Sequence, residues 1–106
     1  MKQWVTVAEE REFEQYDRKL AEVGEGLLVG LFKVGSTYYA VEAWCSHERA
    51  LLTHGEMEGT QIECPLHGAR FDLRTGRPLT PPAVRPIRCY PVRVRDGAIE
   101  IEVDLP

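Results

Sequence analysis

The sequence predicts an all-β domain. Three observations lead to this fold class: short runs of β-branched and aromatic residues recur along the chain, glycine and proline separate them, and two pairs of runs are joined by two-residue turns. The clearer of these turns is Asp96-Gly97, a dipeptide typical of β-hairpins. No repeat or linker-like tract divides the 106 residues, so we expect one domain.

The segment of residues 8–23 is ambiguous. Phe13, Tyr16, Leu20 and Val23 follow a helical spacing among charged residues, so the pattern alone favours an amphipathic helix. In a chain that is otherwise rich in β signals, we expect only a short helical turn at residues 9–13. A strand over residues 18–23 then follows.

The remaining strands are indicated by turn residues and by alternation. Ile99, Ile101 and Val103 alternate with acidic residues, which predicts one buried and one solvated face. Residues 60–63 form a short strand before Cys64, and residues 71–73 begin a small hairpin. The two larger hairpins join residues 27–34 to 37–41 through Gly35-Ser36, and residues 86–94 to 98–103 through Asp96-Gly97.

Composition and charge restrict the possible partners. The apolar fraction is 43% and the formal net charge is −4, as for a soluble globular domain. The longest apolar stretch, residues 27–32, is far shorter than the ~20 residues that cross a bilayer. An overall acidic chain also argues against nucleic acid as the main partner. We therefore expect a protein that binds neither membranes nor nucleic acid. The odd number of cysteines, without the spacing of a disulfide framework, indicates the reducing cytoplasm, and a chain of this size is expected to be a monomer.

The charges are unevenly distributed along the chain. Residues 64–95 carry seven arginines against the single acid Asp72, whereas residues 9–25 and 96–106 are acidic. Such a basic segment suggests docking to another protein, with Arg70, Arg74 and Arg77 as candidate contacts. An ordinary solvated surface is the alternative.

Two short motifs carry the chemistry. Cys45-Ser46-His47 is followed, after sixteen residues, by Cys64-Pro65-Leu66-His67. Thiolate and imidazole are ligands of zinc and of iron–sulfur clusters. Each motif supplies one cysteine and one histidine, which suits a two-iron centre with both cysteines on one iron and both histidines on the other. A structural zinc site is the alternative.

On these motifs the chain resembles the Rieske [2Fe–2S] family, and the resemblance continues through residues 69–76 to Pro81-Pro82. It implies the Rieske iron–sulfur fold, an antiparallel β-sandwich base with an inserted cluster-binding subdomain. The base would comprise residues 1–42 and 84–106, and the subdomain residues 43–83. It also implies that Pro81-Pro82 closes a loop over the cluster. The implied ligands of one [2Fe–2S] cluster per chain are Cys45, His47, Cys64 and His67.

One branch of that family differs from this chain. The Rieske subunits of respiratory and photosynthetic cytochrome complexes have an extra cysteine in each ligand loop and hydroxyl side chains after the second histidine. Here Ala50 and Leu66 stand at the cysteine positions, and Ala69 and Phe71 at the hydroxyl positions. Without those O–H donors the reduced cluster is less stabilised, so we expect a low reduction potential.

The resemblance implies a soluble one-electron carrier, similar to the ferredoxin component of aromatic-ring-hydroxylating dioxygenase systems that act in aromatic hydrocarbon catabolism. Such a carrier is not itself an enzyme. It passes electrons from a flavoprotein NAD(P)H ferredoxin reductase to a terminal oxygenase. The alternatives are a Rieske-like small subunit of nitrite reductase and a zinc-binding interaction module.

Two further residues of ligand type receive structural interpretations. His54 matches no ligand position, so we expect it to be an exposed loop residue. Cys89 lies in a predicted strand between Arg88 and Tyr90, where a free cysteine usually behaves as a small buried apolar residue.

Overall fold

A computed structural model of the chain describes residues 1–46, 49–66, 68–81 and 85–105. These residues form three antiparallel sheets. The first contains, in spatial order, β1 (Lys2–Glu9), β10 (Ala98–Asp104) and β9 (Val92–Arg95). The second contains β2 (Arg18–Val23), β3 (Leu27–Val34), β4 (Thr37–Glu42) and β8 (Cys89–Tyr90). The third contains β5 (Met57–Glu58), β6 (Gln61–Glu63) and β7 (Arg70–Asp72).

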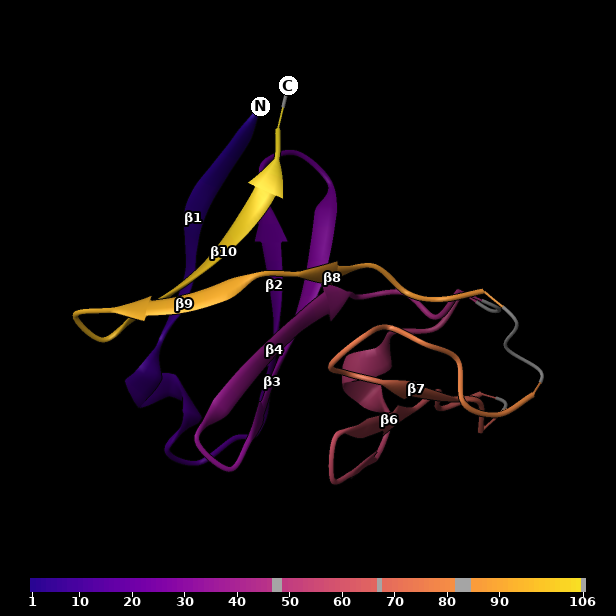
Figure 1. Cartoon of the computed structure of the whole chain (residues 1–106). Helices are drawn as coiled ribbons and strands as arrows, with labels where there is room; N and C mark the ends of the chain where they lie inside the picture. Colours follow the sequence, from indigo (N-terminus) through magenta and orange to yellow (C-terminus); the bar gives the residue numbers. More distant parts are fainter. Residues whose placement is uncertain (47–48, 67, 82–84, 106) are drawn as a thin grey trace.

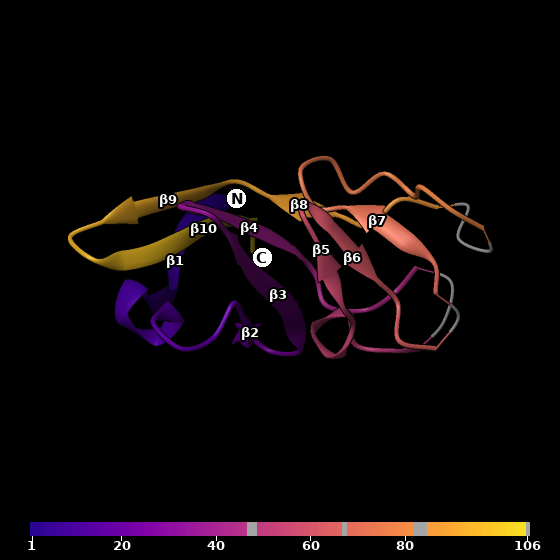
Figure 2. The same cartoon turned by 90° about the horizontal axis from the view of Figure 1, so that it is seen from below.

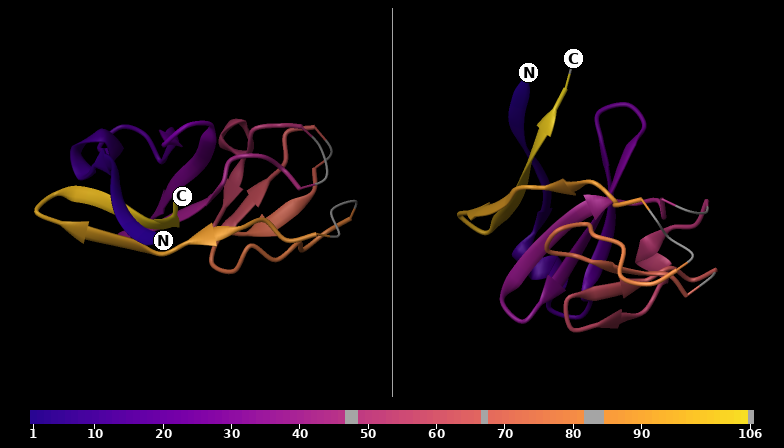
Figure 3. Two further views of the ribbon diagram at one scale, coloured as in Figure 1. Left: turned by 90° about the horizontal axis from the view of Figure 1, so that it is seen from above. Right: turned by 45° about the vertical axis from the view of Figure 1, so that its right-hand side comes forward.

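The three sheets make a flat molecule of 39 × 33 × 19 Å. The first two sheets lie together on one side, and the third sheet lies beside them (Figures 1 and 2). Both chain termini are at the end of the first sheet, away from β6 and β7 (Figure 3). Within the described residues, no helix has the length and apolar character needed to cross a membrane.

Residues 8–23, whose pattern was ambiguous, have the structure that we expected. A single 3-10 turn, η1 (Glu10–Phe13), precedes β2. In β2 the side chains of Ala21 and Val23 are buried while those of Leu20 and Glu22 are exposed, which is the alternation of a strand with one wet face. The helical spacing was misleading because Tyr16 and Leu20 face solvent.

The hairpin from β3 to β4 is confirmed with its two-residue turn, but the expected long strand over residues 86–94 is wrong. It divides into β8, which pairs with β4, and β9, which pairs with β10. Pro91 separates the two, and a proline has no N–H to donate to a ladder. The chain therefore passes from one sheet to the other at this residue. Strand β1, which the sequence pattern did not single out, pairs with β10 along its length.

Two separate hydrophobic cores fill the molecule. One lies between the first two sheets and includes Leu31, Ile99 and Ile101. The other extends from Phe32 and Val41 of the second sheet into the third sheet, where Phe71 is fully buried. The side chains of β3 contribute to both cores on opposite faces, since Leu31 and Phe32 are consecutive.

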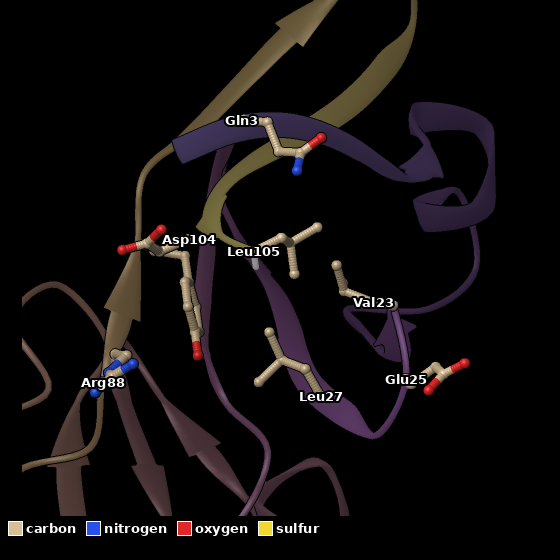
Figure 4. A pocket seen from close by; sticks show the side chains of 9 residues that line it. Gln3, Val23, Glu25, Leu27, Arg88, Asp104 and Leu105 are labelled. Atoms are coloured by element: carbon tan, nitrogen blue, oxygen red, sulfur yellow. The ribbon is translucent and has the colours of Figure 1, made fainter. Parts of the chain in front are cut away.

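The sandwich of the first two sheets is open at the end that holds the termini. A hollow of about 650 Å³ lies between the β2–β3 turn and the end of β10, with Val23, Leu27 and Leu105 as its apolar walls (Figure 4). Polar side chains of Gln3, Glu25, Arg88 and Asp104 line its rim. None of its lining residues belongs to the two cysteine-containing loops.

Candidate metal centre

The first cysteine motif forms a loop that is closed by backbone pairing. Cys45 follows β4, and its N–H donates to the carbonyl oxygen of Ala50 at 2.9 Å. Next to this bond Trp44 and Leu51 form an isolated antiparallel bridge. Leu52, the first residue of the short 3-10 turn η2 (Leu52–His54), donates its N–H to Ala43 at 2.8 Å. These bonds fix both ends of the loop on the second sheet.

The second motif repeats the same closure. Cys64 follows β6, and its N–H donates to the carbonyl oxygen of Ala69 at 2.7 Å, again five residues further along. Gly68 N–H donates back to the Cys64 carbonyl at 3.0 Å. Gly68 has a φ of +71°, a conformation that a residue with a Cβ rarely adopts, and this explains the glycine after the predicted ligand position.

The two loops bring the cysteines into one buried core. Cys45 is 6% exposed and Cys64 is 1% exposed, and both belong to the core shared with Ala69 and Phe71. Both residues carry thiols rather than a disulfide. Two buried thiols at the ends of matched loops fit a metal centre, because deprotonated sulfur is a strong ligand for iron and zinc. His47, His67 and Pro82 lie outside the described residues.

The loop residues after Cys64 form the exposed surface next to it. Pro65 is exposed and Leu66 is 60% exposed. With Trp44 and Leu51 of the first loop they line a shallow groove of about 400 Å³. The guanidinium of Arg49 lies 5.2 Å from the centre of the Trp44 ring, a cation–π distance.

Two further residues of ligand type, His54 and Cys89, were expected to have structural rather than ligand roles. His54 is exposed on η2. Cys89 is partly buried, and its Sγ lies 3.8 Å from the carbonyl oxygen of Leu73. Burial raises the pKa of the Cys89 thiol above its usual value.

The three arginines proposed for docking differ in their surroundings. Arg70 lies 3.4 Å from Glu58 and 3.5 Å from Glu63, so two carboxylates face its charge. Arg74 donates from both Nε and a terminal nitrogen to Asp72, at 3.1 and 3.0 Å. Arg77 is exposed; its backbone N–H donates to the Thr75 hydroxyl at 3.2 Å, and its carbonyl oxygen accepts from the Asp72 N–H at 2.9 Å. Local acids therefore offset much of the basic character of residues 70 and 74.

The structure also shows two arginines whose role the sequence pattern did not indicate. Arg18 of β2 donates to the carbonyl oxygens of Thr53 and Gly55, which joins the second sheet to the segment between the two loops. Arg85 and Ser46 are hydrogen-bonded to each other. Both contacts join residues more than 30 positions apart, so no local sequence pattern could have revealed them.

Comparison with known proteins decides the family. The model of the Rieske [2Fe–2S] domain matches residues 3–91, which is most of the chain. The chain belongs to the Rieske [2Fe–2S] domain family. Its predicted all-β Rieske fold and [2Fe–2S] cofactor are thereby confirmed.

Relatives place this Rieske protein among ferredoxins. It is 38% identical over 87 residues to the anthranilate 1,2-dioxygenase ferredoxin subunit of Burkholderia cepacia, a match that covers 82% of this chain and 81% of that subunit. It is 44% identical over 80 residues to the 3-phenylpropionate/cinnamic acid dioxygenase ferredoxin subunit of Escherichia coli K12, over 74% of each chain. The prediction of a Rieske ferredoxin, an electron carrier, is confirmed.

A solved structure of a complex contains a chain with a similar fold. A chain in the complex of reduced oxygenase and oxidized ferredoxin in carbazole 1,9a-dioxygenase superposes with a TM-score of 0.86. The identity is 28%, and the match covers 92% of this Rieske chain and 91% of that chain.

Proposed function

We propose that this Rieske ferredoxin carries single electrons from a flavoprotein NAD(P)H reductase to the terminal oxygenase of a ring-hydroxylating system. The similarity to two dioxygenase ferredoxin subunits over most of each chain supports this function. The complex of a similar ferredoxin with its oxygenase supports the second partner. The cytoplasm is the proposed compartment, because the chain has an odd number of cysteines without the spacing of a disulfide framework.

The proposed ligands are the Cys45 and Cys64 thiolates for the inner iron and the His47 and His67 imidazoles for the outer iron. When bound, the cluster supplies one-electron oxidation and reduction. The burial of both cysteines in one core and the matched closure of their loops support this assignment. The protein holds the two thiols away from water, and each loop is closed by its own backbone hydrogen bond, from Cys45 to Ala50 and from Cys64 to Ala69.

The division of the chain into a base and a subdomain is part of the proposal. The base comprises residues 1–42 and 84–106, and the subdomain residues 43–83. Two observations support this division. Strands β5 to β7 of the third sheet all fall within residues 43–83, and the molecule has two separate hydrophobic cores.

The test is spectroscopy of the purified protein and of cysteine variants. Visible absorption and low-temperature EPR are recorded before and after dithionite, with iron and acid-labile sulfide assayed on the same sample. The wild type is expected to contain two irons and two sulfides and to give a rhombic signal when reduced. Cys45→Ser and Cys64→Ser should abolish that signal, whereas the matched control Cys89→Ser should retain it.

The other candidate functions give different results in the same samples. A colourless wild-type protein with one zinc per chain indicates an interaction module and contradicts the proposed electron transfer. Co-purification with a sirohaem enzyme indicates the small subunit of a nitrite reductase. Loss of the signal in Cys89→Ser, with the signal retained in Cys64→Ser, contradicts the ligand assignment alone.

A further inference from the structure

The first ligand loop is bonded to a residue that follows it by 39 positions. The hydroxyl of Ser46 donates to the carbonyl oxygen of Arg85 at 2.6 Å. In the opposite direction, the guanidinium of Arg85 donates to the carbonyl oxygen of Ser46 at 3.1 Å. The side chain of each residue thus donates to the backbone carbonyl of the other, and these two hydrogen bonds together hold the pair in place.

The segment that carries Arg85 is itself anchored. Arg88 N–H donates to a carboxylate oxygen of Glu42 at 2.7 Å, and Glu42 N–H donates to the Arg88 carbonyl at 2.8 Å. Ile87, between these two arginines, is buried in the core that contains Cys45 and Cys64. Arg85 is therefore held by a fixed backbone on one side and by Ser46 on the other.

Arg85 lies beside the first cysteine. Together with Glu42, Cys45, Ser46 and Pro86 it lines a hollow of about 310 Å³. The Ser46 carbonyl that its guanidinium binds belongs to the residue directly after Cys45. Glu42 also lines this hollow, and one oxygen of its negatively charged carboxylate accepts the hydrogen bond from the Arg88 N–H.

A fixed positive charge beside Cys45 favours the reduced state of an electron-transfer centre held there. Reduction adds one negative charge to a cluster, and a nearby cation stabilises that charge. An arginine retains its charge at all physiological pH values. The hydrogen bonds with Ser46 keep the guanidinium next to the loop, where a mobile surface arginine would spend much of its time in solvent.

We propose that Arg85 is a positioning residue of the metal centre: its reciprocal hydrogen bonds with Ser46 fix the first ligand loop, and its charge raises the reduction potential. This inference rests on the proposed function, because it requires the cluster at Cys45 and Cys64. It assigns to residues 46 and 85 a role in tuning the centre rather than in binding it.

The test measures the midpoint potential of variants that separate charge from hydrogen bonding. Arg85→Gln removes the charge and should decrease the equilibrium constant for reduction about two- to tenfold, which is about 20 to 60 mV. Arg85→Lys keeps the charge and should stay close to the wild type. The matched control is Arg95→Gln, which makes the same charge change at the exposed end of β9, far from the third sheet (Figure 1).

A double-mutant cycle tests the hydrogen bonding. Ser46→Ala removes the bond to the Arg85 carbonyl without changing any charge. If Ser46 acts by holding Arg85, Ser46→Ala lowers the potential in the wild type but not in the Arg85→Gln background. Equal shifts in both backgrounds would overturn the positioning role.

The remaining outcomes are distinguishable. Equal potentials for Arg85→Gln and Arg95→Gln, measured on proteins that both show the wild-type EPR signal, overturn the electrostatic role and leave the proposed function intact. A wild-type protein without any iron–sulfur signal overturns both together.

Discussion

At the scale of single residues, the surroundings of the two cysteine thiols are apolar. Ala69 and Phe71 have no exposed surface and share the core with Cys45 and Cys64. Neither side chain can donate a hydrogen bond. Hydrogen bonds to the sulfurs of a reduced, more negative cluster stabilise it, so their absence is consistent with a low potential.

Introducing hydroxyl groups at these two positions should raise the potential. The double variant Ala69→Ser/Phe71→Tyr adds two O–H donors to the core that contains both cysteines, and its midpoint potential is measured by protein-film voltammetry. Leu73→Met, a change of similar size in the same core, is the control for altered packing. A midpoint equal to that of the wild type would show that these hydroxyl positions do not set the potential.

At the scale of elements, the turn after β7 depends on one carboxylate. Asp72 accepts hydrogen bonds from the backbone N–H of Arg74 at 2.9 Å and from its guanidinium, and its own carbonyl accepts from Gly76 N–H at 2.7 Å. Gly76 has a φ of +80° and lies against Ile87, where a Cβ would meet the Ile87 carbonyl. The turn therefore requires both an acid at residue 72 and a glycine at residue 76.

The contribution of Asp72 should depend on pH. The hydrogen bond from Arg74 holds the pKa of Asp72 below its usual value of 3.8. Its stabilisation is therefore complete above the unfolded pKa and is lost as the pH falls through the lower, folded pKa. Asp72→Asn should lower stability by about 1 kcal/mol at pH 7. The difference in thermal midpoint from the wild type should shrink below about pH 4; a difference that is constant from pH 7 to pH 3 would contradict this account.

A second element-scale contact joins the sheets. The Arg18 guanidinium bonds two backbone carbonyls, those of Thr53 and Gly55, and lies 5.9 Å from the centre of the Phe32 ring. Gly55 in turn packs so closely on the Glu63 carbonyl that any Cβ would overlap it, and Glu63 precedes Cys64. A continuous path of contacts thus leads from β2 to the second ligand loop.

Removing this contact should loosen the third sheet selectively. Arg18→Met keeps the length of the side chain but loses its hydrogen bonds, at a cost of about 2 kcal/mol. Amide hydrogen exchange should increase at Gly55 and Glu63 and stay unchanged in β1 and β10. Lys19→Met is the control, since Lys19 bonds Glu12 and the Val7 carbonyl, both on the first-sheet side. Faster exchange throughout the chain in Arg18→Met would indicate global destabilisation instead.

The sequence indicated most elements because their signals are local. The turn residues Gly35-Ser36 and Asp96-Gly97 determine where two hairpins reverse, and both turns are observed. The strand change at Pro91 and the pairing of β1 depend on partners distant in sequence, so the local pattern does not contain them. The metal centre shows the same difference. The two cysteine motifs are local and could be recognised in the sequence, whereas Arg18 and Arg85 make their contacts with residues distant in sequence.

At the scale of the whole molecule, exposed arginines lie on two separate sides. Arg74 and Arg77 follow β7, whereas Arg95 ends β9 on the opposite side of the molecule (Figure 1). A local positive surface after β7 would orient a small carrier toward an acidic region of a larger partner. Because Asp72, Glu58 and Glu63 offset Arg74 and Arg70, Arg77 is the most available of the three predicted docking arginines.

Docking through this side should be sensitive to charge and to salt. Arg77→Glu should slow reduction by the reductase or transfer to the oxygenase severalfold at low ionic strength, and the effect should fade as salt screens the charges. Arg95→Glu, at the exposed end of β9, is the matched control. Stopped-flow rates that respond equally to the two substitutions, or to neither, would contradict docking at Arg77.

The burial of Cys45 and Cys64 also has a consequence for how the protein is made. Because the two residues are only 6% and 1% exposed, the finished fold leaves little access for a donor protein to their thiols. If they hold the cluster as proposed, iron and sulfide must be delivered while the ligand loops are still open, and loop closure must follow loading.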